Sequence, residues 1–475
     1  MKSFSVLLCG VAVSLIAACA STVTPENQFE GVVETASGHL AGTAAGDIIV
    51  FKGIPFAQPP VSALRWRAPQ PVSWPGILPA DSFSPACPQP LNADGTPNGG
   101  GYAGPISEDC LYLNIWAPRE AENAPIMVFL YGGGGVVGAG SLPTYDGSAF
   151  AQDGIILVTI NYRLGALAGF AHPSLTAEAG QSPSTNFHLL DAIAALSWVK
   201  ENAGAFGGDP DNILLFGQSA GATMTANLVT SPMAEGLFSK AIFESTGSLL
   251  TPATPLALAK ERGRELARDL GLPYADASPE ALRALEARTI LAHPKYGFGA
   301  RTILDGKVKT QTIADSFRDG NAQDVLLMVG TNSDEGRLAG TNAIAAFAED
   351  GAPVWQYFFD YVPEALRGQN PNGAPHSAEL PFVFNTLETY PALAGAITPE
   401  DRRAAALVHS CWKAFARAKA GDTVLECGDG FSWPARSAAN AHAVAIFQAE
   451  PSLGRASELR SPPNGAEPGP SHRDD

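Results

Sequence analysis

The chain has 475 residues, of which 45% are hydrophobic and 16% are charged, a length that suits one large α/β domain or two to three smaller ones with a sizeable core. Its 47 acidic and 30 basic residues give a net charge of −17. This balance argues against nucleic acid as a partner, because phosphates must be neutralised by Lys and Arg, and against substrates steered by a basic surface.

The N-terminus has the features of an export signal. The apolar run from Val6 to Ala20 is too short to span a bilayer, and we expect residues 1–18 to be a signal peptide. The run ends in Leu-Ile-Ala-Ala-Cys, which resembles the bacterial lipoprotein box, in which the cysteine becomes the lipidated first residue. We therefore expect a periplasmic or outer-membrane lipoprotein anchored through Cys19, followed by a tether at 19–30. Plain secretion after cleavage at a small-residue site is the alternative. No other segment has the pattern of a transmembrane span.

Four cysteines remain in the body of the chain, as two pairs that are close in sequence: Cys87 with Cys110, and Cys411 with Cys427. An even set of cysteines in an exported chain favours disulfides.

The hydrophobic pattern predicts a series of strands. From Val32 it alternates through a glycine-rich hairpin at 38–42 and an apolar segment at 48–51, which indicates antiparallel edge strands. Residues 53–105 are rich in Pro and Gly and read as loops. Continuous apolar segments then predict buried strands at 111–116, 126–130, 155–160, 213–216, 240–243, 325–329, 354–360 and 443–447.

Segments with helical periodicity lie between these strands, at 187–202, 220–228, 255–270, 279–287 and 399–420. Apolar strands that alternate with helices predict an α/β fold, with a central, mostly parallel sheet covered by helices on both faces. Neither a repeat nor a linker divides residues 31–456, which we take as one domain. Residues 457–475 are rich in Pro, Ser and charge and are predicted to be disordered.

The motif Gly217-Gln218-Ser219-Ala220-Gly221 follows a predicted strand and opens a predicted helix. That is the context of a nucleophile elbow, in which a Ser on a strained turn presents its hydroxyl at the top of the sheet. A surface turn would explain the serine alone, but not its position between strand and helix. Ser219 is therefore the candidate nucleophile.

Four consecutive glycines, Gly132 to Gly135, follow the strand that ends at Leu130. Acyl transfer builds negative charge on the carbonyl oxygen, and preorganised backbone N–H groups stabilise it. Such a loop after an early strand supplies these donors in esterases. A merely flexible loop would carry a large cost in backbone entropy. We expect the N–H groups of Gly133, Gly134 and Ala220 to form the oxyanion hole.

Together these motifs resemble the type-B carboxylesterase family, which also contains the cholinesterases and many bacterial esterases. Further matching segments follow in family order: Phe51–Ala57 (FKGIPFA), Leu64–Pro69 (LRWRAP), Ser107–Trp116 (SEDCLYLNIW), Asn161–Gly165 (NYRLG) and Gly207–Pro210 (GGDP).

The resemblance implies an α/β-hydrolase fold, hydrolysis of a small carboxylic ester by a Ser-Glu-His triad, and neither cofactor nor metal. It also implies a disulfide between Cys87 and Cys110, and two structural ion pairs, Arg65–Glu108 and Arg163–Asp191. The pairing of Cys411 with Cys427 rests on proximity and parity alone.

The acid of the triad follows the nucleophile in chain order. The segment Gly330–Gly336 (GTNSDEG) comes after a predicted strand and is similar to the family's acid segment, which assigns the role to Glu335. Chemistry alone leaves Asp334 as a rival, since either carboxylate could hold an imidazole.

Four histidines follow the acid. His409 lies within a predicted helix, His442 beside a predicted strand, and His472 in the predicted tail. His376 lies in a loop, Gly373–Leu380 (GAPHSAEL), which resembles the family's histidine segment and is followed by an aromatic-rich stretch. We therefore expect His376 to be the base.

Three departures from the family pattern concern the pocket. Glu335 and His376 are only about 40 positions apart, so most of the usual helical insertion is missing. Gly135 replaces the usual aromatic residue of the glycine loop. The segment Glu244–Ser248 (ESTGS) holds one residue more than the usual E-S-G-S, which puts the supporting serine of the triad in doubt. We expect these changes to widen the site.

Two other functions are compatible with the resemblance. A cholinesterase would hold a quaternary ammonium group on aromatic faces, but the segment between Cys87 and Cys110 contains no Trp and only Tyr102. The elbow also has Gln218 where cholinesterases have an acid. A non-catalytic adhesion protein of this family would usually lack the Ser or the His. The sequence therefore favours an ester hydrolase, while its natural ester and oligomeric state stay open.

Overall fold

The computed structural model describes residues 31–92, 102–246, 253–293, 301–348, 352–437, 440 and 442–460. The predicted signal peptide, Cys19 and the tether lie outside the described residues, as do positions 461–475 of the predicted tail. Leu459, three positions past the expected boundary at 456, is buried against Phe358 and Val444.

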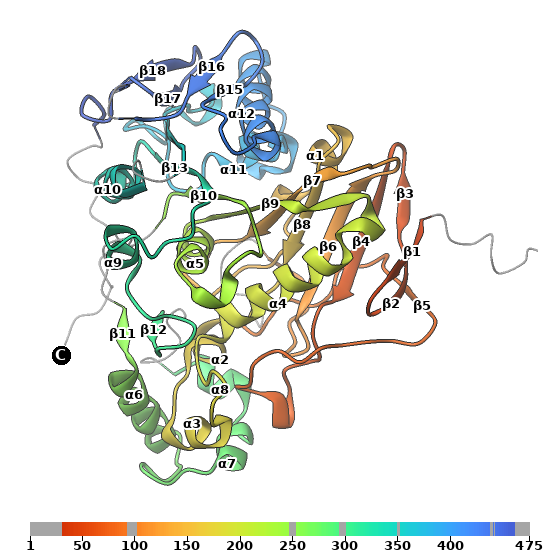
Figure 1. Cartoon of the computed structure of the whole chain (residues 1–475), viewed down its shortest axis with the longest axis vertical. Helices are drawn as coiled ribbons and strands as arrows, with labels where there is room; N and C mark the ends of the chain where they lie inside the picture. The colour runs from red at the N-terminus through yellow and green to blue at the C-terminus, as the bar shows by residue number, and fades with distance from the viewer. Residues whose placement is uncertain are drawn as a thin grey trace, which may run out of the picture.

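An eleven-stranded sheet forms the centre of the molecule, in the order β18-β17-β14-β13-β10-β9-β7-β8-β6-β4-β3 (Figure 1). The strands from β8 to β17 in this order are mutually parallel, and β6, β4, β3 and β18 pair antiparallel at the two edges. The bounds are β3 (Thr43–Ala45), β4 (Ile48–Pro55), β6 (Tyr112–Pro118), β7 (Ala124–Leu130), β8 (Ile156–Ile160), β9 (Gly208–Gln218), β10 (Lys240–Glu244), β13 (Leu326–Asn332), β14 (Val354–Phe359), β17 (Val444–Phe447) and β18 (Ser452–Gly454). The mostly parallel sheet expected from the sequence is confirmed.

The N-terminal hairpin departs from the expectation. Strands β1 (Val32–Thr35) and β2 (Gly38–Ala41) form a separate three-stranded sheet with β5 (Ile77–Pro79), so only β3 and β4 lie at the edge of the main sheet. The chain turns between the two sheets at Gly42, where a Cβ would lie 2.7 Å from the ring of Phe51. Two more pairs, β11 (Thr254–Pro255) with β12 (Ile303–Leu304) and β15 (Val424–Glu426) with β16 (Ser432–Pro434), form small two-stranded sheets.

Helices cover both faces of the main sheet. In Figure 1, α4 and α5 lie on one side, whereas α1 and α12 lie on the other. The bounds are α1 (Ser148–Gln152), α2 (Gly165–Gly169), α3 (Pro173–Ala179), α4 (Phe187–Asn202), α5 (Ala220–Val229), α6 (Leu256–Asp269), α7 (Pro279–Arg283), α8 (Ala287–Leu291), α9 (Ile313–Arg318), α10 (Leu338–Ala348), α11 (Leu380–Val383) and α12 (Pro399–Arg417). The segment predicted as one helix at 279–287 is divided, because Glu286 is extended between α7 and α8. Among the described residues, none of the helices has the length and hydrophobicity needed to cross a membrane.

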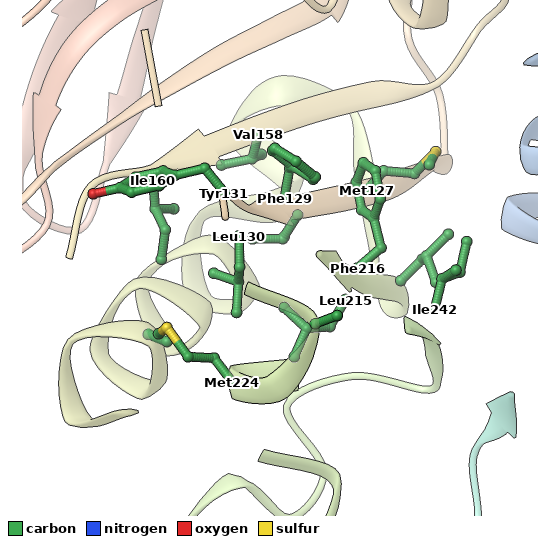
Figure 2. Close-up of a cluster of buried hydrophobic side chains, with 14 of the residues drawn as sticks. Met127, Phe129, Leu130, Tyr131, Val158, Ile160, Leu215, Phe216, Met224 and Ile242 are labelled. Atoms are coloured by element: carbon green, nitrogen blue, oxygen red, sulfur yellow. The ribbon is translucent and has the colours of Figure 1, made fainter. Parts of the chain in front are cut away.

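Buried apolar side chains fill both faces of the sheet where β8, β7 and β9 lie side by side. Leu130 and Leu215 point toward Met224 of α5, whereas Phe129 and Phe216 pack together on the opposite face with their ring centroids 4.8 Å apart (Figure 2). Each large apolar side chain buried in this way contributes about 1.5–3 kcal/mol. Since both faces are covered, the strands read as continuous apolar runs. This packing fixes the carboxyl ends of β7 and β9, where the glycine loop and the elbow begin.

The expected crosslinks are present. Disulfides join Cys87 to Cys110, as the resemblance implied, and Cys411 to Cys427, the pairing expected from proximity and parity. Arg65 pairs with Glu108 at 2.5 Å, and the buried Arg163 pairs with Asp191 at 2.6 Å, each as a structural ion pair.

Candidate active site

Ser219 lies between β9 and α5 with a backbone φ of 58° and ψ of −118°. This conformation is strained for a non-glycine residue and persists only where the surroundings impose it. The two motif glycines explain how. A Cβ at Gly217 would lie 2.6 Å from the backbone of Gly221, and a Cβ at Gly221 would lie 1.9 Å from the carbonyl oxygen of Leu130. The strand, turn and helix therefore pack closely enough to hold Ser219 in the geometry of a nucleophile elbow.

The glycine loop runs beside this serine. A Cβ at Gly132 would lie only 3.1 Å from Cβ of Ser219. The backbone N–H groups of Gly133 and Gly134 donate to none of the other described residues, and Ala220 is the first residue of α5, where an N–H has no partner within the helix. Among the described residues, the three N–H groups predicted to form the oxyanion hole therefore have no partner, and the loop that carries two of them runs beside Ser219.

Gly135, which stands where an aromatic residue was expected, also has a structural part in the loop. It is buried with φ at 69°, and its carbonyl oxygen accepts a 2.8 Å hydrogen bond from the N–H of Gly165. A side chain at this φ would be strained. Gly135 therefore anchors the loop, and the adjacent Gly134 is the exposed position, with no atom closer than 3.9 Å to an added Cβ.

Glu335 is held by a dense set of donors just beyond β13. Its Oε1 accepts from Ser245 Oγ at 2.5 Å, from Thr331 Oγ1 at 2.7 Å and from the N–H of Asn332 at 2.5 Å. Burial alone raises the pKa of this carboxyl, but hydrogen bonds from His376, Ser245 and Thr331 outweigh burial and leave the pKa of Glu335 below its ordinary value. Glu335 is therefore an ionised, immobile carboxylate at neutral pH.

His376 Nδ1 bonds Oε2 of Glu335, which completes the acid–base pair predicted from the sequence. The rival Asp334 instead pairs through its backbone with the histidine loop, since its N–H donates to the carbonyl oxygen of Ala374 at 3.0 Å. His409 is buried between Val383 and Asp153 and is structural, as expected.

The other two histidines that follow the acid in the sequence are not part of this pair. His442 faces Arg455, and His472 lies outside the described residues.

Among the described residues, no hydrogen bond links Ser219 Oγ to His376. Nε2 of His376 instead lies 3.4 Å from the side-chain amide nitrogen of Gln218, the residue before the nucleophile. Catalytic hydrogen bonds often reach their working length only in the complex with substrate. The elbow, the acid and the base nevertheless follow the carboxyl ends of β9, β13 and β14, parallel strands of one sheet, and ligands bind at this end of open α/β sheets.

Ser245 is a supporting residue that the sequence left in doubt. It follows β10 with φ at 52°, its N–H donates to Gly330 at 2.9 Å, and its hydroxyl reaches Glu335. The extra residue of the ESTGS segment comes after Ser245 and does not displace it. Arg337 was not anticipated: its Nη1 donates to the carbonyl oxygen of Ser245 at 3.0 Å, and its Nε lies 3.5 Å from Oε2 of Glu335.

A second buried carboxyl lies behind the histidine loop. The side-chain amide of Asn332 donates to Glu379 at 2.5 Å and to the carbonyl oxygen of Pro375 at 2.7 Å. Burial, followed by the charge of Glu335, raises the pKa of Glu379 to about 7. Below about pH 7 Glu379 is therefore mostly neutral, whereas the pKa of Glu335 lies below its ordinary value.

The described residues contain no group of three or more His, Cys, Asp or Glu side chains placed to hold a metal ion.

Comparison with known proteins shows which family the chain belongs to. The Carboxylesterase family model matches residues 30–342. The chain is 35% identical over 453 residues to the fumonisin B1 esterase of Sphingopyxis macrogoltabida, covering 81% of each chain. It is 34% identical over 470 residues to the para-nitrobenzyl esterase of Bacillus subtilis, covering 85% of this chain and 92% of the relative.

A solved PNB esterase structure superposes with a TM-score of 0.77 at 31% identity, covering 90% of this chain and 97% of that one. These similarities to bacterial esterases confirm the α/β-hydrolase fold and support a carboxylic-ester hydrolase. The chain belongs to the carboxylesterase family.

Proposed function

We propose that this protein hydrolyses carboxylic esters through an acyl-enzyme formed on Ser219. The observation that carries the proposal is the strained backbone of Ser219, which lies against the glycine loop. The preceding residue, Gln218, contacts His376 through its side-chain amide. His376 Nε2 accepts the proton of the Ser219 hydroxyl as its oxygen attacks the ester carbonyl. Glu335 holds the imidazole through Nδ1, so that Nε2 is the free base, and stabilises the imidazolium that forms.

The negative charge of the tetrahedral intermediate develops on the former carbonyl oxygen, where the N–H groups of Gly133, Gly134 and Ala220 stabilise it. Collapse of the intermediate breaks the ester C–O bond, and the imidazolium gives its proton to the departing alcohol. Water then attacks the acyl-enzyme, with His376 again as the base, and releases the carboxylic acid and free Ser219.

Hydrolysis of a p-nitrophenyl acyl ester separates a catalyst from a protein that only binds. Ser219→Ala and His376→Ala should each lower kcat by on the order of 10⁴-fold or more, because the members of a triad act as a unit. Ser197→Ala, an exposed serine on α4, is the matched control and should retain wild-type activity. Full activity in Ser219→Ala would refute the proposal, and an inactive wild type would favour an adhesion-type binding protein.

We further propose that the site accepts bulky esters. The side chain of His376 is 35% exposed, and the exposed Gly134 adds no wall beside the loop. Between Glu335 and His376 the described residues form a single α-helix, α10, and the strand β14, in keeping with the reduced insertion. A wide site relaxes the exclusion of bulky alcohols and buries less of a small ester. The value of kcat/KM for branched or aryl esters should therefore approach or exceed that for acetates, and a strict preference for acetates would refute this.

We also propose that the protein is exported. The lipoprotein-like segment that ends at Cys19 is the direct argument, and the two disulfides support an oxidising compartment. We place the protein in the periplasm or at the outer membrane, with secretion as the alternative.

A further inference from the structure

The glycine loop, residues 132–138, is hydrogen-bonded at its C-terminal end by the buried side chain of Gln89. We propose that Gln89 is a positioning residue for the oxyanion hole: its amide holds Gly138, and through Gly138 it fixes the N–H groups of Gly133 and Gly134 in place. This inference rests on the proposed function, because it presumes that these N–H groups stabilise the oxyanion formed by Ser219.

The grip is bidentate. Gln89 Oε1 accepts the N–H of Gly138 at 3.1 Å, and Gln89 Nε2 donates to the carbonyl oxygen of the same residue at 3.0 Å. Nε2 also donates to the carbonyl oxygen of Cys87 at 3.2 Å, and the Gln89 side chain is buried. A buried amide satisfied on both sides fixes a backbone position far better than a solvated contact, because breaking it leaves unpartnered polar groups in the interior.

The segment that carries Gln89 is itself immobilised. Cys87, two residues earlier, is buried and bonded to Cys110. Further upstream, Asn161 Nδ2 donates to the carbonyl oxygen of Pro85 at 3.2 Å, while its Oδ1 accepts the N–H of Gly140 at 2.9 Å. Two side-chain amides therefore link Gly138 and Gly140, at and just past the end of the glycine loop, to the segment around Cys87.

The position of Gly138 is transmitted to the donors by a tight turn. The N–H of Val137 and that of Val136 both donate to the carbonyl oxygen of Gly133, at 3.1 and 3.0 Å. Gly138 has φ at 120°, and a Cβ there would lie 2.6 Å from the ring of Tyr131, so its backbone packs directly on that ring. Consecutive glycines have little conformational preference of their own. External contacts must therefore supply the order, and Gln89 makes two of them.

The expected effect follows from what the donors do. Removing one oxyanion-hole donor costs on the order of 10²–10³ in kcat, and a misplacement of about 1 Å can cost about 10²-fold. Gln89→Met keeps the length and volume of the side chain but removes both hydrogen bonds to Gly138. We expect kcat to fall about 10- to 100-fold with KM changed by less than about threefold, because the substrate groups away from the carbonyl still bind.

Three variants and two readouts test this. Gln89→Asn is one methylene shorter and stays polar, so kcat should rank wild type, then Asn, then Met, and the Asn variant decides the question if Met fails to fold. Asn202→Leu is the matched control, since Asn202 is a buried amide that links α4 to Ala36 far from the loop. It should lower the melting temperature without lowering kcat.

The second readout is inhibition by an alkyl trifluoromethyl ketone, whose adduct with Ser219 carries the oxyanion. Its inhibition constant should rise by the same factor as kcat falls. Wild-type kcat and inhibition constant in Gln89→Asn and in folded Gln89→Met would overturn the inference while leaving Ser219-dependent hydrolysis intact. If Ser219→Ala instead hydrolyses the ester as fast as the wild type does, the proposed function is overturned. A fall in kcat with an unchanged inhibition constant would also overturn the positioning role.

Discussion

Glu335→Gln is the substitution whose outcome the geometry defines most closely. Three donors, from Ser245, Thr331 and Asn332, converge on Oε1. A glutamine amide at this position must therefore turn its oxygen toward these donors, because the opposite orientation would face an NH₂ group with two hydroxyls and a backbone N–H. The NH₂ group then faces Nδ1 of His376 and donates to it. The imidazole proton is forced onto Nε2, and the base that should accept the Ser219 proton is blocked.

The magnitude combines two losses. The wrong tautomer and the missing negative charge beside the imidazolium together cost about 10⁴ in kcat in the equivalent change to a serine-protease triad. That factor corresponds to about 5.4 kcal/mol of transition-state stabilisation. The carboxylate of Glu335 takes part in four hydrogen bonds, three at Oε1 and one at Oε2, so the amide that replaces it has little freedom to reorient. We therefore expect a loss of the same order here.

The assay is steady-state hydrolysis of a p-nitrophenyl acyl ester at pH 7–8, with Asp334→Asn as the matched control. Asp334 is the neighbouring carboxylate, is half-buried, and bonds Ala374 through its backbone N–H. Its amide variant undergoes the same change of charge and should stay within about threefold of wild type. Less than a tenfold loss in Glu335→Gln, or a larger loss in Asp334→Asn, would refute the assignment of the acid.

Three further outcomes are expected. Ser245→Ala should lower the free energy of unfolding at pH 7 by about 1.5–3 kcal/mol, the usual worth of a hydrogen bond to a charged group, as measured by chemical denaturation; no change would show that the bond is not maintained. His188 is buried, and burial lowers its pKa to about 4. The unfolded chain therefore takes up a proton between pH 6.5 and 4 that the folded chain does not, and stability falls across that window by about 3 kcal/mol. His188→Leu should remove this part of the loss between pH 7 and 4.5, and an unchanged pH dependence would contradict it. Cys19→Ser should abolish labelling by a fatty-acid probe and release the protein from membranes, whereas an unlabelled, soluble wild type would favour secretion.

The features that could be predicted from the sequence are those set by short segments. The elbow needs glycines at 217 and 221 because backbone atoms from β7 and α5 occupy the space of a Cβ, and that requirement is written within five residues. Strand and helix positions follow from periodicity, since strands covered on both faces are continuously apolar. The acid and the base were assigned through chain order and resemblance, and the structure brings Glu335 and His376 together.

What the sequence could not provide depends on which strands become neighbours. Ser245 reaches Glu335 only because β10 and β13 are adjacent and in register from Lys240 with Leu326 to Glu244 with Gly330. The contact of Gln89 with Gly138 joins loops about 50 positions apart, and no local sequence pattern predicts it. The positive φ of Gly135 could not be predicted either, because the sequence shows only that the usual aromatic side chain is missing and says nothing of the backbone angle.

The acyl-enzyme is the central claim, and it can be observed directly. The protein would be mixed with an excess of a p-nitrophenyl ester, quenched in acid within the first turnover, and digested for mass spectrometry. The account predicts that the peptide containing Ser219 gains the mass of the acyl group, and that the gain is absent in Ser219→Ala. An acyl group on another residue, or hydrolysis at the wild-type rate without any acyl group on Ser219, would contradict it.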